Sequence, residues 1–332
     1  STFRTWGNEP FYNVVARQFE LQPGSTDPDK LAINPNAGKK VIVFSDSRQG
    51  AAKIAKDLTE ASDKDLARKI IALAAYELEE WAEDTGNRVT LKRLYPSFLK
   101  VIHDRKIRVF DGESRRTDDE RIADLEEDFD DDYDYSAEDT GTPPDSYREC
   151  LLSVICDRYR SLTDATIGWI QPTKRGWKEA KKVLANAGIS MTENEFNSIF
   201  FSWSSYILVR FTALDSEIPT RVRGKVALPQ SQYGVLESEI FKGQRRGKGS
   251  LVGALSKRFN DEQIAAIGQA LSKFLELPTG SSSSYKYLST GKVMLKIDPD
   301  ADWMTCPRCG KVAPYTLWGV CPYCKQADMV PM

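Results

Sequence analysis

Val41-Ile-Val-Phe-Ser-Asp-Ser-Arg-Gln-Gly-Ala-Ala-Lys-Ile-Ala-Lys-Asp-Leu58 is the stretch that decides the expected fold of the N-terminal part. Its first four residues are apolar and mostly β-branched, which is typical of a strand buried on both faces. Ser45-Asp46-Ser47 is a cluster of helix-capping residues, and apolar side chains then recur at helical spacing as far as Leu58. The stretch therefore predicts a strand, a tight turn and an amphipathic helix, which is half of a βαβ unit.

The predicted turn places hydroxyls, backbone N–H groups and Arg48 at the N-terminus of a helix. A phosphate can bind at such a place, because the unpaired N–H groups and the helix dipole both favour an anion. Many α/β proteins contain a βα unit that binds nothing, so the local pattern leaves both interpretations open.

Composition and charge indicate a soluble protein of more than one domain. The chain has 332 residues, of which 41% are hydrophobic and 28% are charged. The formal net charge is −2, but residues 118–139 contain thirteen acidic residues and one Arg, so the remainder is basic. A basic body with one acidic segment is typical of proteins that bind nucleic acid, although it does not require that partner.

The acidic loop 118–146 has three interpretations. Its default role is solvation. It could instead mimic the phosphate chain of a nucleic acid and shield the binding channel when no substrate is bound. A carboxylate metal site is the third interpretation, but the D-x-D-x-D-G loop pattern is missing.

The chain shows neither an N-terminal secretory segment nor eighteen consecutive apolar residues, so we expect a cytoplasmic protein with no membrane partner. It begins at Ser1, as expected of an excised fragment or of a chain that lacks its initiator.

Of the six cysteines, four form two CxxC pairs, and Cys150 and Cys156 fall on a predicted helix as small core residues.

The two CxxC pairs are the most specific signal in the chain: Cys306-Pro-Arg-Cys309 and Cys321-Pro-Tyr-Cys324, with eleven residues between them. Each pair forms a knuckle that presents two thiolates, and four thiolates suit tetrahedral zinc. Iron in the same cage and two redox pairs are the alternatives. A closed site of four cysteines has no position for a catalytic water, so we expect its role to be structural and to supply the stability of a ribbon with little apolar core. Gly310 permits a tight turn after the first knuckle, whereas Lys325 takes that place in the second, so we expect the second turn to differ.

Helical spacing dominates the middle of the chain. The apolar patterns predict helices over 64–83, 90–104, 118–129, 147–159, 175–187 and 196–211, with Tyr159 on the apolar stripe of the fourth and a capping box at Thr192 and Glu195. The lone His103 lies at a helix end. A helix from Asp261 is followed by two strands, 285–288 and 292–297, around Ser289-Thr290-Gly291, which predicts a winged-helix-like module.

Residues 219–259 are rich in Arg, Lys and Gly. The run Gly243-Gln-Arg-Arg-Gly-Lys-Gly-Ser250 has three residues between its first Gly and its Gly-Lys, whereas a P-loop needs four. It therefore predicts a flexible basic loop, which could follow phosphates or be an ordinary solvated loop.

Phe44-Ser45-Asp46-Ser47-Arg48-Gln49 with Ala51-Ala52 resembles motif IV of superfamily-two (DEAD/DEAH-box-like) helicases. The similarity is greatest to a group whose second RecA-like lobe carries a long insertion and a zinc ribbon, and which includes bacterial DNA-repair and phage-defence helicases. The order of motif IV, helical insertion and four-cysteine ribbon is the same here. The resemblance implies that the turn at residues 45–49 faces a nucleic-acid backbone.

The expected fold class is α+β, mainly α. Residues 1–62 would form part of a second RecA-like lobe, 63–259 a mainly helical insertion with the acidic loop 118–146, 260–300 a winged-helix-like module and 301–332 a zinc ribbon.

The function implied is that of a DNA-binding fragment of an ATP-dependent helicase or translocase. The chain lacks a Walker A sequence, a DEAD/DEAH box and an arginine-finger motif, so we expect no catalytic residue and no ATP hydrolysis by this chain alone. ATP and Mg²⁺ would bind only the full-length parent, whose other lobes, DNA (single-stranded or a duplex junction) and proteins of a defence or repair complex are the expected partners. The alternatives are a protein-interaction scaffold that binds no nucleic acid and a complete enzyme of unknown type. The expected nucleic-acid contacts are Ser45, Ser47, Arg48, Gln49, Arg221, Arg223, Arg245, Arg246 and Lys248.

Overall fold

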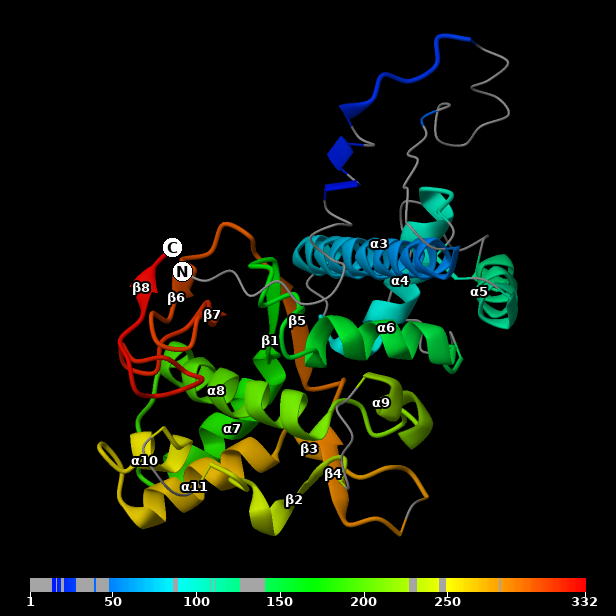
Figure 1. Cartoon of the computed structure of the whole chain (residues 1–332). Coiled ribbons are helices and arrows are strands. Elements are labelled where there is room, and N and C mark those ends of the chain that lie inside the picture. Colours follow the sequence, from blue (N-terminus) through cyan, green and yellow to red (C-terminus); the bar gives the residue numbers. More distant parts are fainter. Residues whose placement is uncertain are drawn as a thin grey trace. The chain divides into compact units, whose positions relative to one another are not determined.

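The computed structural model of the protein describes residues 14–15, 17–18, 21–27, 39, 48–85, 89–107, 109–110, 112–125, 141–226, 232–244, 249–280 and 282–332 (Figure 1). The chain divides into two compact units, residues 1–67 and 68–332. Most described residues belong to the second unit, which is an α+β fold made mainly of helices.

Helix α3 (Arg48–Thr85) contains both helices that the sequence predicts before residue 85, without a break between them. The predicted strand at 41–44 lies outside the described residues. Leu91–Arg93 (η1) and α4 (Leu94–Asp104) follow, as the pattern over 90–104 predicts. Ser97 in α4 donates a hydrogen bond to the carbonyl of Ala74 in α3 at 2.6 Å, which fixes these two helices side by side.

Among the described residues, no helix has the length and apolar character of a membrane span.

Helix α5 (Gly112–Leu125) begins before the acidic segment and includes its first residues. Asp118 is not part of a solvated run: it is 4% exposed and accepts a hydrogen bond from Tyr95 Oη at 2.8 Å. Burial raises the pKa of the Asp118 carboxyl to about 6, although the Tyr95 hydrogen bond opposes this shift. The residues of the acidic loop from 126 to 140 lie outside the described part of the chain.

We expect Asp118→Asn to stabilise the protein at pH 7.5 and to leave it unchanged below pH 4. The folded carboxyl binds its proton more tightly than the unfolded one, whose pKa is about 3.9. The free energy of unfolding therefore decreases as the pH rises from about 4 to about 6, by about 1–2 kcal/mol after allowance for solvent screening. An asparagine oxygen still accepts from Tyr95 but cannot ionise, so the variant should lose this decrease in denaturant unfolding at a series of pH values.

Asp119→Asn is the matched control, because the neighbouring Asp119 side chain is 62% exposed and pairs with Arg115. It should retain the pH dependence of the wild type. An Asp118→Asn protein whose stability still fell between pH 4 and pH 6 would contradict the assignment.

Two antiparallel strands, β1 (Gly168–Pro172) and β5 (Val293–Ile297), lie side by side within the second unit, with Ile170 opposite Leu295 (Figure 1). Two helices follow β1: α7 (Lys174–Asn186), capped by Thr173, and α8 (Glu193–Phe211). The predicted capping box of Thr192 and Glu195 is confirmed at the start of α8. Gly188 adopts φ +69° just beyond α7, as expected of a residue that closes a helix.

Aromatic residues of α8 form a buried core in the second unit. Phe196, Phe200 and Trp203 are fully buried, and Phe274 packs against Phe200 at a ring-centroid distance of 4.8 Å. Trp203 Nε1 donates to the carbonyl of Ile240 at 3.0 Å, so its polar group is satisfied. This confirms the prediction that the aromatic residues of 196–211 form a buried core.

The C-terminal half of this unit contains short elements: β2 (Val235–Leu236), η2 (Glu237–Glu239), α10 (Leu251–Leu255), α11 (Asp261–Ser272), β3 (Leu275–Glu276) and β4 (Tyr285–Leu288). The strands at 285–288 and 293–297 form as predicted, but they do not pair with each other as a wing. One edge of β4 pairs with β2 and the other with β3, whereas β5 pairs with β1. A strand has only two edges, so the predicted β4–β5 hairpin is wrong.

Helix α6 (Asp145–Cys156) ends earlier than the pattern over 147–159 predicts, and it packs beside α9 (Thr220–Val226). Cys156 is 6% exposed, which confirms it as a core residue, and burial raises its pKa to about 12. Cys150 is half-buried in the same helix.

Candidate metal centre and basic surfaces

The C-terminal ribbon is a small sheet with two knuckles. Its strands are β6 (Met304–Thr305), β7 (Val312–Ala313) and β8 (Val330–Pro331), with β6 in the centre. The first knuckle joins β6 to β7, and a two-residue turn at Trp318-Gly319 precedes the second, where the backbones of Leu317 and Val320 bond to each other. The fold therefore brings two CxxC pairs together that lie eleven residues apart in sequence.

The sulfur atoms of Cys306, Cys309, Cys321 and Cys324 all lie within 4.8 Å of one another. The Cys306–Cys324 and Cys309–Cys321 sulfur distances are both 3.7 Å, far beyond the length of a disulfide bond. Zinc–sulfur bonds of about 2.3 Å in a tetrahedron place any two sulfurs about 3.8 Å apart. The residues present therefore fit a four-coordinate metal ion of this size.

The turns of the two knuckles are alike, which corrects the prediction that the second differs. Gly310 has φ +68° and Lys325 has φ +52°, and each donates its backbone N–H to the first cysteine of its knuckle, to Cys306 O and Cys321 O respectively, at 2.9 Å. A left-handed lysine costs of order 1 kcal/mol relative to glycine. The knuckle hydrogen bond imposes the conformation despite this cost.

Polar groups around the sulfurs suit thiolates. The backbone N–H groups of Cys309 and Tyr323 point at Cys306 Sγ and Cys321 Sγ at 3.5 and 3.4 Å. Lys325 Nζ donates to the carbonyl of Tyr323 at 3.0 Å, and burial lowers the pKa of this lysine to about 8 while the neighbouring cysteine sulfurs oppose the shift. A cation beside the site partly offsets the net negative charge of four thiolates around a divalent ion.

The ribbon shares its core with the rest of the second unit. Trp169 of β1 and Phe201 of α8 pack into a cluster with Trp303 and the buried sulfurs of Cys306 and Cys321. Trp169 meets Trp303 edge-on at 5.6 Å. Because residues far outside the ribbon complete its core, the ribbon does not depend on its own few apolar residues alone.

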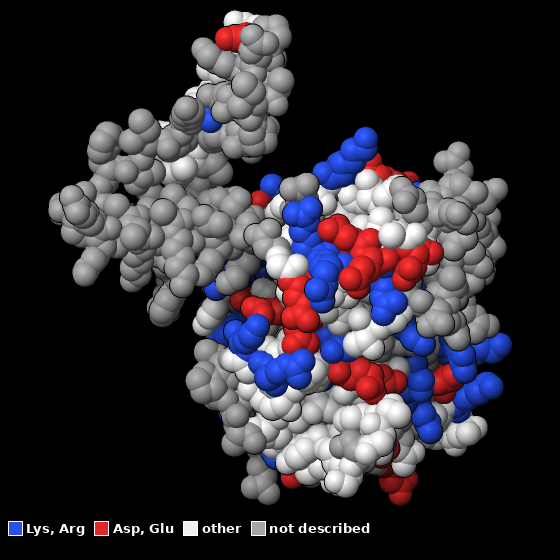
Figure 2. All heavy atoms as spheres, turned by 90° about the vertical axis from the view of Figure 1, so that its right-hand side faces the viewer, with Lys and Arg blue, Asp and Glu red and all other residues white. Residues whose placement is uncertain are grey.

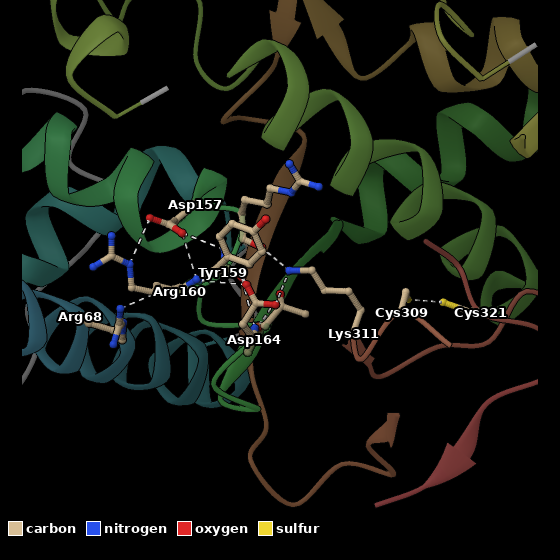
Figure 3. A network of polar contacts seen from close by, with 12 residues as sticks. Arg68, Asp157, Tyr159, Arg160, Asp164, Cys309, Lys311 and Cys321 are labelled. Carbon is tan, nitrogen blue, oxygen red and sulfur yellow. Dashed lines mark hydrogen bonds and ion pairs between the residues drawn. The ribbon is translucent and has the colours of Figure 1, made fainter. Parts of the chain in front are cut away.

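A lysine of the ribbon adds a polar anchor (Figure 3). Lys311 Nζ pairs with Asp164 at 2.7 Å and donates to the carbonyl of Arg158. Both partners belong to the loop between α6 and β1, and the Asp164 side chain is only 14% exposed. No local pattern in the sequence indicates this pair, because its members lie far apart along the chain.

The structure tests few of the predicted nucleic-acid contacts. Ser45, Ser47, Arg245, Arg246 and Lys248 lie outside the described residues. Arg48 and Gln49 begin α3, and their side chains are not described.

Arg221 and Arg223, both on α9, have opposite environments. Arg221 is 72% exposed and pairs with Asp145 at 2.7 Å. Arg223 is 1% exposed and donates to the carbonyls of Thr212, Leu214 and Asp215. The expectation that Arg223 contacts nucleic acid is corrected here, because its donors face the interior and already have partners.

Acidic partners accompany the exposed cations of α9. Lys225 pairs with Glu149 at 2.9 Å, just as Arg221 pairs with Asp145. On the face of the molecule shown in Figure 2, basic and acidic side chains alternate. The described part of this face is therefore not a surface of a single sign.

The helical spacing in the sequence does not predict the loop that follows α6. The sequence predicts Tyr159 on an apolar helix face, but α6 ends at Cys156 and Tyr159 is 61% exposed. Asp157 could have indicated that the helix ends here, because an Asp at a helix end can accept hydrogen bonds from backbone N–H groups two residues on and begin a turn.

The sequence is similar to that of Druantia protein DruE from Escherichia coli (strain UMEA 4076-1), with 28% identity over 322 residues. The match covers 94% of this chain but 16% of that protein, so the chain spans about a sixth of the relative's length. No protein-family model and no solved structure matches the chain.

Proposed function

We propose that the chain is a nucleic-acid-binding segment of a helicase-like phage-defence protein. The similarity to DruE along nearly the whole chain is the observation that carries this proposal. It supports the idea that the chain belongs to a phage-defence protein much longer than the sequence itself. The resemblance of residues 44–52 to motif IV supports a superfamily-two helicase or translocase as the parent. ATP hydrolysis would then belong to the parent and require its other lobes.

Zinc is the metal that we propose for the four cysteines. Four sulfurs at tetrahedral spacing and no open position suit a structural zinc ion. The ion would fix the two knuckles against Trp169 and Phe201 and thereby hold the ribbon on β1 and α8. In this proposal the metal has a structural role in the ribbon and takes no part in a reaction.

The proposed nucleic-acid contacts combine hydroxyls and cations. Hydroxyls and N–H groups at the start of α3 would bind phosphates, and the cations after α9 would add sequence-independent attraction. Arg223 is left out because it is buried. The proposed residues are Ser45, Ser47, Arg48, Gln49, Arg221, Arg245, Arg246 and Lys248.

We expect Arg48→Ala to weaken binding to single-stranded and duplex DNA in fluorescence anisotropy over a salt series. Loss of one phosphate contact should reduce the slope of log affinity against log salt by about 1. Arg115→Ala is the control, because this exposed arginine pairs with Asp119 on α5 and belongs to no proposed contact. Equal slopes for Arg48→Ala and wild type would remove Arg48 from the interface.

A protein-interaction scaffold is the second candidate. The alternation of charge on the face in Figure 2 favours it, since paired cations attract phosphate weakly. Absence of DNA binding at low salt would favour this alternative over the first.

A further inference from the structure

The turn that follows α6 holds three exposed residues in a defined conformation. The carboxylate of Asp157 accepts from the backbone N–H of Tyr159 at 2.8 Å and of Arg160 at 3.0 Å. Arg68 of α3 donates to the carbonyl of Arg160 at 2.8 Å. These bonds fix the backbone, so the side chains of Arg158, Tyr159 and Arg160 are presented without a large ordering cost.

Tyr159 is a large aromatic side chain that the fold leaves in solvent, with 61% of its surface exposed. The Arg158 guanidinium lies 5.2 Å from its ring centroid and Lys311 Nζ lies 5.4 Å from it. Figure 3 shows Lys311 extending from the ribbon toward this ring. An exposed ring with two cations close to it combines an apolar surface with positive charge.

The acidic groups near this ring are already compensated. Asp157 pairs with Arg160 at 3.7 Å, and Asp164 pairs with Lys311 at 2.7 Å. Arg158 is exposed and contributes a further cation. The loop therefore attracts anions around an aromatic platform, unlike the alternating charges on the face of Figure 2.

We propose that Tyr159 is a base-stacking platform for single-stranded nucleic acid, and that Arg158 contacts a phosphate beside the stacked base. This inference rests on the proposed nucleic-acid-binding function and names a surface for it outside the motif IV turn. Stacking accepts any base but requires an unpaired one, because a duplex covers the faces of its bases. The platform therefore favours single strands over duplex and shows little preference for sequence.

The test uses a single-stranded oligonucleotide with one 2-aminopurine, whose fluorescence is quenched when it stacks, and a duplex of the same sequence. Tyr159→Ala should weaken single-strand binding by about 5- to 100-fold, with a much smaller effect on the duplex, and should abolish the quenching. Tyr159→Phe keeps the ring and should bind like the wild type. Because Tyr159 is exposed, neither substitution should lower the unfolding temperature.

Tyr76→Ala is the matched control. Tyr76 is also an exposed tyrosine, at 46%, but it donates to Glu80 at 2.7 Å and lies near Glu79 and Glu83, which repel phosphate. It should leave affinity unchanged. Equal loss of affinity for Tyr76→Ala and Tyr159→Ala would overturn the platform.

Two further results are decisive and differ from each other. If the wild type binds single strands with steep salt dependence while Tyr159→Ala binds equally well, the platform is refuted and the proposed function stands. If the wild type binds neither single strands nor duplex at low salt, both the platform and the nucleic-acid function fail.

Discussion

Cys321→Ser is expected to abolish stoichiometric zinc binding and to lower the unfolding temperature by about 8–16 °C. A structural zinc ion contributes about 10–16 kcal/mol to the folding of an isolated zinc finger. Here part of the ribbon core is supplied by Trp169 and Phe201, so we expect a smaller loss, of at least about 4 kcal/mol. Elemental analysis of the purified chain and thermal unfolding measure the two effects.

Cys156→Ser is the matched control, because it buries a hydroxyl in place of a thiol without removing a metal ligand. Cys156 is 6% exposed and Cys321 is fully buried, but only Cys321 belongs to the sulfur cluster. Cys156→Ser should keep one zinc per chain and cost about 1–3 kcal/mol. A strong chelator should lower the unfolding temperature of the wild type to that of Cys321→Ser and leave Cys321→Ser unchanged. Less than half a zinc per wild-type chain, together with equal stability of the two variants, would refute the metal site.

Features that depend on local spacing could be predicted from the sequence. The capping box of Thr192 and Glu195 and the helix end at Gly188 follow from residues a few positions apart, and each CxxC spacing places two of the four cysteines in one knuckle. Local geometry decides these features: the side chains of Thr192 and Glu195 bond to nearby backbone N–H groups, and Gly188 adopts the left-handed conformation that ends a helix.

Features that depend on distant partners could not be predicted. The sequence indicates where β4 and β5 form, but pairing of β5 with β1 joins segments separated by more than a hundred residues. Lys325 resembles no turn residue, yet the backbone bond to Cys321 imposes a left-handed conformation on it. Among the candidate contacts, Arg223 lies in a basic run that suggests exposure, and only the packing of α9 against α6 shows that it is buried.

Arg223→Met is expected to decrease the free energy of unfolding by about 3–5 kcal/mol. The substitution retains most of the side-chain volume but leaves the buried carbonyls of Thr212, Leu214 and Asp215 without their donors. It also removes the stacking of the guanidinium on Tyr287, whose ring centroid is 4.2 Å away. Denaturant unfolding followed by circular dichroism measures the loss.

Arg221→Met is the matched control on the same helix, two residues before Arg223. Its side chain is 72% exposed and its pair with Asp145 is solvated, so we expect a loss below about 1 kcal/mol. Arg223→Lys should recover little of the stability, because one ammonium group cannot reach three carbonyls arranged for a planar guanidinium. If Arg223→Met were as stable as Arg221→Met, the guanidinium would not hold the loop after α8, and an exposed, phosphate-binding Arg223 would again be the better explanation. A large difference instead means that basic residues of one short helix have separate roles, one within the fold and one at its surface.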